Sequence, residues 1–333
     1  MPSLFSIAGN KRHVDTLILL YEERFRLREP CKKEKGTVKE AEKRIESKIS
    51  RTAEFTCLSR AASFYEKTPE YRSNDFIATK LIPRYLAPLI KNRVIKNWLM
   101  NRFFAKGTYE YVIARTKYID SIFQKAISSE FDQILLFGAG FDSRGIRFAS
   151  ANTNTKIFEM DVPITQDAKI AQLKKRNIEI GPNIIFIPID FSRESLEDKL
   201  LESGFKKNQK SLFILEGLLM YLNKETVDAT FHVIDEFAED GSEAVFDYVY
   251  SSVLKEENLY YGETEVYKLV KKENEPWCFG IEKGEIESFL EQRNLRLIEN
   301  LNSGDLEKKF FTDEWGNTVG RINGTHCIAH ARK

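Results

Sequence analysis

Two glycines and three acidic residues follow short apolar runs in this sequence, and their types and positions suit the binding of a nucleoside. The glycines are Gly138 and Gly140, and the acidic residues are Asp161, Asp190 and Glu216. Glycine lets the backbone turn sharply and lets a ligand approach without a Cβ in the way. Carboxylates accept hydrogen bonds from ribose hydroxyls and from amino groups. The pattern therefore predicts a ligand site built from a glycine turn and several carboxylates.

The glycine motif lies between a predicted strand and a predicted helix. Residues 133–137 form an apolar run suited to a buried parallel strand, and Gly138-Ala-Gly140 follows at once. Ser143 stands where the dinucleotide-binding fingerprint has its third glycine. Alone, the motif is as consistent with a plain strand-to-helix turn as with a ligand site. It becomes informative with the acidic residues that follow.

Asp161 closes the next apolar run, just over 20 residues after Gly138. In a doubly wound sheet this position faces the ribose of a bound nucleoside, and a carboxylate there accepts two hydroxyl hydrogen bonds. The alternative is a helix cap, because Pro163 suits the first turn of a helix. The sequence leaves both interpretations of Asp161 open.

Asp190 and Phe191 follow the third apolar run. An aspartate beside an aromatic residue at a strand end can accept a hydrogen bond from an adenine amino group while the apolar neighbour flanks the ring. The alternative is that Asp190 caps a helix beginning at residue 194, although Ser192 could cap that helix itself.

Glu216 lies within the apolar run 212–222, where an unpaired charge would be expensive to bury. It is therefore predicted to bind a cationic group of the ligand. The alternative is an internal salt bridge with Arg115 or Arg144. The chain lacks the third glycine of the dinucleotide fingerprint and the phosphate-binding Gly-Lys-Ser/Thr motif at this position. S-adenosylmethionine, a nucleoside without phosphates that bears an ammonium and a sulfonium, fits such acidic groups best.

Alternating apolar runs and amphipathic segments predict the elements that position these residues. The predicted strands are 133–137, 156–160, 184–187, 211–215, 242–248, 294–299 and 325–331. The predicted helices among them are 142–149, 164–176, 194–203, 223–239, 252–272 and 282–292. Such alternation predicts right-handed βαβ units and a largely parallel sheet. The last two strands are joined by about 25 residues without an obvious helix, which favours an antiparallel final pair.

The N-terminal third is predicted to be helical and separate in character. We expect residues 1–106 to form an extension and a helical cap, and residues 107–333 to form the ligand-binding domain. The stretch 90–104 is basic and aromatic and includes Trp98. It suits a helix packed on the core, and a lid over a substrate pocket is the alternative.

Composition and charge exclude several classes of function. The chain has 333 residues, with 51 basic and 50 acidic side chains and a net charge of +1. This balance predicts binding to neither nucleic acid nor an anionic membrane. No apolar run approaches the roughly 20 residues that a membrane span needs. The N-terminus has its charges after its apolar residues, the reverse of a secretion signal, so a cytoplasmic protein is expected.

Cysteine and histidine spacing does not predict a metal site. Four cysteines lie far apart and are expected to be reduced thiols: Cys31, Cys57, Cys278 and Cys327. His326 and His330 would share one face of a strand, but no third ligand is near them in the sequence.

Several longer motifs resemble the leucine carboxyl methyltransferase family, including its bacterial S-adenosylmethionine-dependent branch. The resemblance runs from about residue 52 to residue 332. It rests on residues 114–120 (Ala-Arg-Thr-Lys-Tyr-Ile-Asp), 137–144 (Phe-Gly-Ala-Gly-Phe-Asp-Ser-Arg), 158–163 (Phe-Glu-Met-Asp-Val-Pro), 189–192 (Ile-Asp-Phe-Ser) and 215–222 (Leu-Glu-Gly-Leu-Leu-Met-Tyr-Leu). It implies a Rossmann-like class I methyltransferase fold, with a mostly parallel seven-stranded sheet, helices on both faces and an N-terminal helical cap.

The resemblance also implies a role for each site residue. Arg115 would bind the methionyl carboxylate through its planar fork, and Gly138, in the same turn as Gly140, would line the methionine. Asp161 would hold the ribose, Asp190 and Phe191 would flank the adenine, and Glu216 would lie near the amino-acid end. Tyr221 would contact the substrate near the methyl group. The basic extension before residue 50 departs from the family pattern and leaves the substrate open.

The implied reaction is a direct displacement in which a substrate oxygen attacks the sulfonium methyl. A carboxylate substrate, on a small molecule or a peptide, needs no general base because it is ionised near neutral pH. An alcohol or phenol would need one, and His232, predicted in mid-helix, does not suit that role. Two alternatives are a nicotinamide-dependent oxidoreductase and a non-catalytic interaction module with a methyltransferase-like fold.

Overall fold

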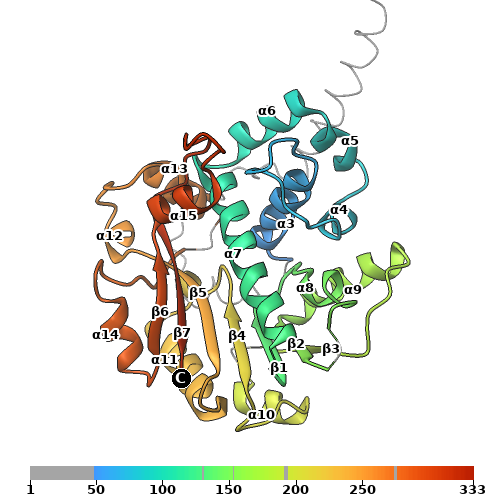
Figure 1. The fold of residues 1–333 in the computed structure, drawn as a ribbon, viewed down its shortest axis with the longest axis vertical. Coiled ribbons are helices and arrows are strands. Elements are labelled where there is room, and N and C mark those ends of the chain that lie inside the picture. The colour runs from blue at the N-terminus through green and yellow to red at the C-terminus, as the bar shows by residue number, and fades with distance from the viewer. Residues whose placement is uncertain (1–48, 130, 153, 191–193, 274–275) are drawn as a thin grey trace, which may run out of the picture.

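The structure is a computed structural model that describes residues 49–129, 131–152, 154–190, 194–273 and 276–333 (Figure 1). The predicted N-terminal extension lies outside the described residues as far as residue 48, and so does Phe191.

A single seven-stranded sheet forms the centre of the molecule, with its strands in the order β3-β2-β1-β4-β5-β7-β6. The strands are β1 (Gln133–Phe137), β2 (Lys156–Asp161), β3 (Ile184–Pro188), β4 (Ser211–Leu215), β5 (Glu243–Val249), β6 (Arg296–Leu301) and β7 (His326–Arg332). β1 to β5 pair in parallel, and β7 inserts antiparallel between β5 and β6. The seven predicted strands and the antiparallel final pair are confirmed.

Helices cover both faces of the sheet, so the central strands are buried on both sides. Alternate residues of β1 enter different cores: Ile134 and Leu136 pack beneath α7, while Leu135 and Phe137 pack against the α10–α11 side. The long helix α7 crosses one face in Figure 1. Burial on both faces explains why these strands read as continuous apolar runs rather than as alternating patterns.

The helices after β1 mostly match the predictions. They are α8 (Arg144–Arg147), α9 (Pro163–Lys175), α10 (Leu196–Glu202), the 3₁₀ turn η1 (Leu219–Tyr221), α11 (Lys224–Phe237), α12 (Ser251–Leu254), α13 (Glu263–Glu273), α14 (Ile286–Glu291) and α15 (Ser303–Phe310). The single helix predicted over 252–272 is wrong. Gly262 breaks it with a φ of 76°, and a side chain there would overlap the Lys106 carbonyl oxygen.

Helix α15 occupies the connection between β6 and β7, where no helix was predicted. Asn302 begins it with a reciprocal capping box: its side chain accepts from the Asp305 amide, and the Asp305 carboxylate accepts from the Asn302 amide. The apolar pattern hides this helix because Leu306 is the one residue of α15 that is fully buried, and Gly304 lowers the propensity of its first turn.

The N-terminal part of the described chain forms a group of helices on one end of the sheet (Figure 1). They are α3 (Arg51–Phe64), α4 (Ala78–Leu81), α5 (Leu86–Lys91) and α6 (Arg93–Phe103), which we call the cap, and they are followed by α7 (Thr108–Ser128). The single helix predicted over 90–104 is interrupted at Asn92, whose side chain caps α6 by accepting from Val94 and Ile95 amides. Within α6, Leu99 is buried while Trp98 is 42% exposed.

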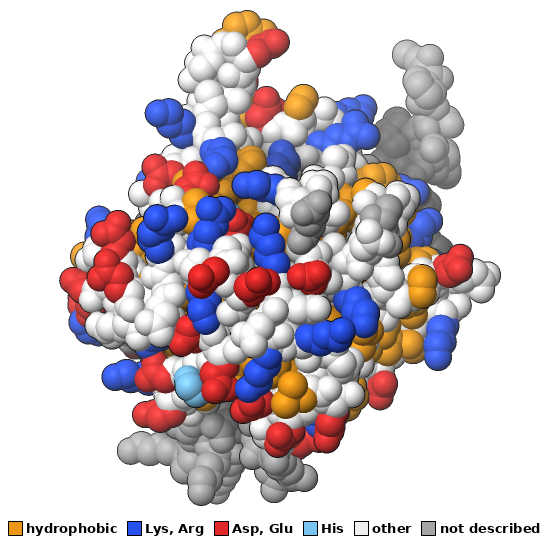
Figure 2. Space-filling view, turned by 60° about the horizontal axis from the view of Figure 1, so that its bottom comes forward, with side chains coloured by type: hydrophobic (Ala, Val, Ile, Leu, Met, Phe, Trp, Pro, Cys, Tyr) orange, Lys and Arg blue, Asp and Glu red, His pale blue; other side chains and the backbone are white. Residues whose placement is uncertain are grey.

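The surface mixes both signs of charge. On the face shown in Figure 2, basic and acidic side chains are interspersed rather than gathered by sign. Such mixing gives that face no strong field of one sign. Within the described residues, no helix combines the length and apolar character that crossing a membrane requires.

We expect Gly107→Ala to destabilise the junction between the cap and the sheet domain. Gly107 begins α7 with a φ of 73°, and an added Cβ would overlap backbone atoms of residues 321–323. The left-handed backbone costs about 1–2 kcal/mol, and the overlap adds about 1–3 kcal/mol. Thermal unfolding of the variant measures the total.

Gly204→Ala is the matched control for this prediction. Gly204 has a φ of 81°, but no atom lies within 4 Å of the position that a Cβ would take. It should show the backbone cost alone. Equal losses in both variants would show that the contact between Gly107 and residues 321–323 has no energetic weight.

Candidate functional site

The predicted site residues gather at one edge of the sheet, where β1, β2, β3 and β4 end. The antiparallel strand β7 begins at the same edge, since His326 lies opposite Val249 at the end of β5. Gly138 and Gly140 turn the chain there with φ values of 59° and 51°. Residues other than glycine rarely adopt this left-handed backbone conformation. The Cβ of Ala53, from the first turn of α3, approaches Gly140 from the cap.

The Asp161 carboxylate holds the glycine turn in place. It accepts hydrogen bonds from the Gly140 amide and, at 2.7 Å, from the Val162 amide. The cap residue of α9 is Val162, without a side-chain capping bond, so Asp161 does not cap this helix. Burial raises the pKa of Asp161, and the two amide bonds oppose that rise. Asp161 thus joins the end of β2 to the glycine turn after β1.

Asp190 follows β3 and is partly buried, and its own amide donates to Glu194 Oε2 at 2.7 Å. The helix after it begins later than predicted, at Leu196, and Ser195 caps it by accepting from the Asp198 amide. Asp190 is therefore not the cap of α10. Ser192, like Phe191, lies outside the described residues.

Glu216 forms an ion pair with both arginines that the sequence offered as partners. Its Oε1 lies 3.0 Å from Arg115 Nε, and its Oε2 lies 2.7 Å from Arg144 Nη1. Burial opposes the ionisation of Glu216, but the Arg144 and Arg115 guanidinium groups outweigh it and lower its pKa to about 2. The interpretation of Glu216 as a salt-bridge residue is confirmed, and its predicted contact with a ligand stays a prediction.

Asp247 is a residue of this site that the sequence analysis missed. It is fully buried on β5 and accepts from Arg115 Nη1 at 2.5 Å, from Tyr111 Oη at 2.9 Å and from the Gly217 amide at 2.6 Å. A lone carboxylate in the apolar strand Ala-Val-Phe-Asp-Tyr-Val was the available signal, and it is the same signal that singled out Glu216. Asp247 fixes both the Arg115 guanidinium and the turn after β4.

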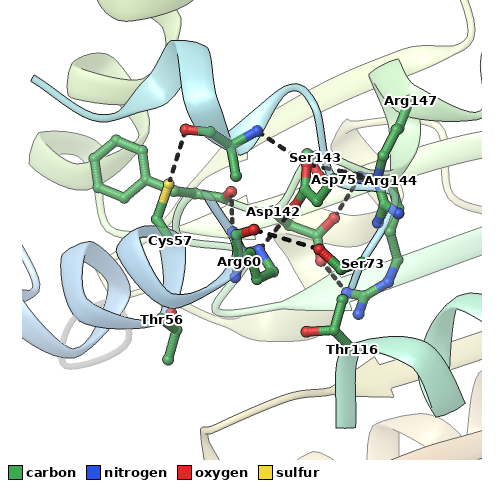
Figure 3. A network of polar contacts seen from close by, with 12 residues as sticks. Thr56, Cys57, Arg60, Ser73, Asp75, Thr116, Asp142, Ser143, Arg144 and Arg147 are labelled. Carbon is green, nitrogen blue, oxygen red and sulfur yellow. Dashed lines mark hydrogen bonds and ion pairs between the residues drawn. The ribbon is translucent and has the colours of Figure 1, made fainter. Parts of the chain in front are cut away.

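These pairs continue into a buried network that reaches the cap. Figure 3 shows the side chains of Arg60 and Asp75 close to those of Arg144 and Arg147. Arg60 also donates to the Phe141 carbonyl at 2.6 Å, which ties α3 to the glycine turn. The network contains the arginines Arg60, Arg115, Arg144 and Arg147 and the carboxylates Asp75, Asp120, Asp142, Glu216 and Asp247.

The charges of this network do not balance. With all groups ionised, four arginines face five carboxylates, a net charge of −1. Asp161 adds a further negative charge, because it accepts amide hydrogen bonds and forms no ion pair with a described residue. This edge of the sheet is therefore suited to a ligand that brings positive charge.

Tyr221 lies at the end of η1, beyond the turn that follows β4. Its hydroxyl is 3.4 Å from Thr52 Oγ1, at the start of α3. Three residues of α3 thus contact this edge of the sheet: Thr52 contacts Tyr221, Ala53 lies against Gly140, and Arg60 donates to the Phe141 carbonyl. The cap therefore covers the strand ends here.

The two histidines of β7 lie at opposite ends of their strand. His330 contacts Glu243 at 2.9 Å, far from the glycine turn, whereas His326 is at the site edge. His326 is buried, which lowers its pKa to about 4, so it is neutral at pH 7. No group of three potential metal ligands occurs in the part of the chain that the structure describes.

Comparison with known proteins identifies the family. The family model described as leucine carboxyl methyltransferase matches residues 54–235, which is more than half of the chain. The chain belongs to the leucine carboxyl methyltransferase family. The family match does not favour the nicotinamide-dependent oxidoreductase that the glycine motif left open.

Two relatives and a solved structure are similar to this chain, the relatives in sequence and the structure in fold. The chain is 29% identical over 223 residues to "Putative S-adenosyl-L-methionine-dependent methyltransferase YktD" of Bacillus subtilis, covering 66% of this chain and 72% of that protein. A protein of Mycobacteroides abscessus with the same description is 29% identical over 60% of this chain and 66% of its own. The crystal structure of "a putative methyltransferase" from Thermobifida fusca is similar to this chain with a TM-score of 0.52 and 15% sequence identity. The similarity covers 83% of this chain and 94% of that chain. Its likeness confirms the class I methyltransferase fold.

We expect Glu216→Gln to remove an acid-sensitive part of the stability. The pKa of Glu216 is about 2 in the folded chain and 4.5 ordinarily, so its contribution is complete above pH 4.5 and is lost as pH falls through 2. This difference corresponds to about 3 kcal/mol. Chemical denaturation at several pH values should show the gap between wild type and variant narrowing by about that amount from pH 6 to pH 2.

Glu287→Gln, on the exposed side of α14, is the control for this prediction. The unfolding free energy of the Glu287→Gln variant should equal that of the wild type at every pH. If the gap between the wild type and Glu216→Gln did not change with pH, the ion pairs of Glu216 with Arg115 and Arg144 would have no role in acid stability.

Proposed function

We propose that this chain transfers the methyl group of S-adenosylmethionine to a carboxylate oxygen of a small molecule or of a protein C-terminus. The observation that supports it most is the bond between the Asp161 carboxylate and the Gly140 amide at the carboxyl edge of a class I methyltransferase sheet. This arrangement puts an acidic group beside a glycine turn, as binding of an adenosine ribose requires. The name of the matching family supports the carboxylate as acceptor.

The cofactor would lie across the strand ends, with its adenosine over β2 and β3. Asp161 would accept from the ribose hydroxyls, and Asp190 from the adenine amino group. Gly138 and Gly140 would let the methionine part approach the backbone. The net negative charge of the arginine–carboxylate network favours the cofactor's ammonium and sulfonium over a dinucleotide, whose phosphates would be repelled.

Arg115 would bind the methionyl carboxylate while its own partners hold it still. Its guanidinium has five N–H donors, and the contacts to Glu216 and Asp247 run through Nε and Nη1. A Cβ at position 217 would lie 3.3 Å from Arg115 Nη1, so Gly217 lets this turn lie close against the guanidinium. A guanidinium that is already held in place can bind a carboxylate without a further entropic cost of ordering its side chain.

The reaction itself needs little from acid or base groups. An acceptor oxygen donates a lone pair to the methyl carbon, the carbon–sulfur bond breaks, and sulfur keeps that bonding pair to give S-adenosylhomocysteine. The protein supplies orientation and a site sheltered by the cap. Of the described histidines near the edge, His326 has a pKa of about 4, which makes it a poor base for an alcohol or phenol. His232 is exposed on α11. A carboxylate is already ionised near neutral pH, so it needs no general base.

Tyr221 would orient the acceptor oxygen toward the methyl group. It stands in η1, directly beyond the turn that contains Glu216 and Gly217, and it meets Thr52 from the cap. A hydroxyl in this place can donate to one carboxylate oxygen while the other attacks.

Transfer of tritiated methyl groups tests the proposed function. The purified chain would be incubated with methyl-labelled S-adenosylmethionine and a set of carboxylic acids, alcohols and peptides. Methyl esters release methanol in mild alkali, whereas methyl ethers and N-methyl groups do not. Labelled product that is lost in alkali is expected, and alkali-stable label alone would assign the transferase to a different acceptor atom.

We expect Asp161→Ala to weaken S-adenosylhomocysteine binding by about 1.5–3 kcal/mol, the range for hydrogen bonds to a charged group. The binding of adenosine should weaken by the same amount, because both ligands contain the ribose that Asp161 would contact. Calorimetry measures the affinities, and thermal unfolding measures stability on the same samples. Lowered stability with unchanged affinity would return Asp161 to a purely structural role at the glycine turn.

We expect Arg115→Lys to weaken the binding of S-adenosylmethionine more than the binding of adenosine. Lysine keeps the charge but loses the fork that pairs with a carboxylate, and adenosine has no carboxylate. Parallel titrations with the two ligands separate the roles of Arg115. Equal losses for both ligands would mean that Arg115 serves only as the structural partner of Glu216 and Asp247.

A further inference from the structure

We propose that Trp277 forms the acceptor-binding wall of this site, and that its indole N–H donates to the carboxylate of an acid with a flat apolar body. This inference rests on the proposed function and names its substrate class. The observations behind it are the anchoring of the loop that contains Trp277, the ring stack beneath it, and a buried indole N–H that has no hydrogen-bond partner among the described residues.

The loop that follows α13 brings Trp277 to the site edge. The amides of Cys278 and Phe279 both donate to the Met220 carbonyl, at 2.7 and 3.3 Å. Met220 belongs to η1, the turn that ends with Tyr221. The backbone beside Trp277 is thus tied to the element that would orient the acceptor, and Trp277 packs against the core on the α11 side of the sheet.

A stack of rings connects Trp277 to the cofactor end of the site. The Trp277 ring stands at 89° to the His326 ring with centroids 5.3 Å apart. His326 in turn stacks on Tyr111 at 4.4 Å, and Tyr111 donates to Asp247 at 2.9 Å. The Arg115 guanidinium carbon lies 5.4 Å from the Tyr111 ring centroid. Trp277 is therefore the outer member of a rigid series that begins at the residue proposed to hold the methionyl carboxylate.

The Trp277 Nε1–H group has no hydrogen-bond partner in the described chain, although the atom is buried. The indole nitrogen can only donate, and a buried donor without a partner is costly. The arginines at this edge already contact carboxylates: Arg115 pairs with Glu216 and Asp247, and Arg144 pairs with Asp120 and Glu216. An acceptor that supplies an oxygen to Trp277 would satisfy this donor.

A neutral donor suits the chemistry better than another arginine would. A full positive charge beside the attacking carboxylate would lower the basicity of its oxygens and so weaken the nucleophile. His326 adds no charge here, since burial lowers its pKa to about 4. The indole N–H and the Tyr221 hydroxyl can both donate to the same oxygen, which leaves the other free to attack the methyl group.

The surroundings of Trp277 favour a flat apolar body on the acid. The Trp277 ring is partly exposed, and behind it stand the buried rings of His326 and Tyr111, which stack on each other. An aromatic ring supported in this way binds planar or apolar groups over its face and edge. A peptide C-terminus would bring backbone amides that need partners, and these rings provide none.

Fluorine NMR of the protein labelled with 5-fluorotryptophan tests this inference without turnover. The chain has three tryptophans, so Trp277→Phe and Trp315→Phe assign the three resonances. With S-adenosylhomocysteine present, phenylacetate should shift the Trp277 resonance saturably, whereas benzyl alcohol, which has the ring without the carboxylate, should not. Trp315 is 77% exposed, and its resonance should stay in place.

Kinetics with phenylacetate or a better planar acid complete the test. Trp277→Phe keeps a ring but loses the N–H, so KM for the acid should rise about tenfold or more, with kcat and S-adenosylmethionine affinity little changed. Trp315→Phe should leave all three quantities as in the wild type. A Trp277 resonance that responds to a peptide C-terminus and not to planar acids would overturn the inference. Absence of S-adenosylhomocysteine binding would instead overturn the proposed function.

Discussion

The contact on which the rest of this structure depends is the buried carboxylate of Glu216 between two arginines. Each of these charges alone would be too costly to remove from water, so Glu216, Arg115 and Arg144 are stable inside the protein only together. Arg115 needs Asp247 as well, and Arg144 needs Asp120, so the pairing extends across α7, α8, the end of β4 and β5. It also reaches α3 of the cap, whose Arg60 pairs with Asp75 and donates to the Phe141 carbonyl beside the glycine turn. One electrostatic requirement thus joins the cap, the sheet and the long helix α7.

The same network gives the site its preference for charge. Because carboxylates exceed arginines and Asp161 has no cationic partner among the described residues, a ligand with positive groups completes the balance. The network is rigid, since most of its members are held by two or more partners, so little reorganisation is needed when charge moves from sulfur during transfer. Binding specificity and the chemistry of methyl transfer therefore have a common physical origin.

Much of this could be predicted from the sequence, because short apolar runs ending in glycine or a carboxylate mark parallel strands buried on both faces. The seven strands, the antiparallel final pair and the pairing of Glu216 with arginines follow from that pattern. Asp247 was missed, although it too is a lone carboxylate in an apolar strand, because its partners Arg115 and Tyr111 lie more than 130 positions away. Helix α15 was missed because it buries little, and the meeting of Trp277 with His326 depends on how a loop folds over η1, which no local pattern encodes.

A calorimetric titration with S-adenosylmethionine tests the central claim most directly, since the charge balance of the strand ends is proposed to exist for this cofactor. We expect saturable heat with one cofactor bound per chain, and no comparable heat with NADH, whose phosphates the network would repel. Absence of heat, together with no shift in thermal unfolding at millimolar S-adenosylmethionine, would contradict the account. So would NADH binding as tight as that of S-adenosylmethionine.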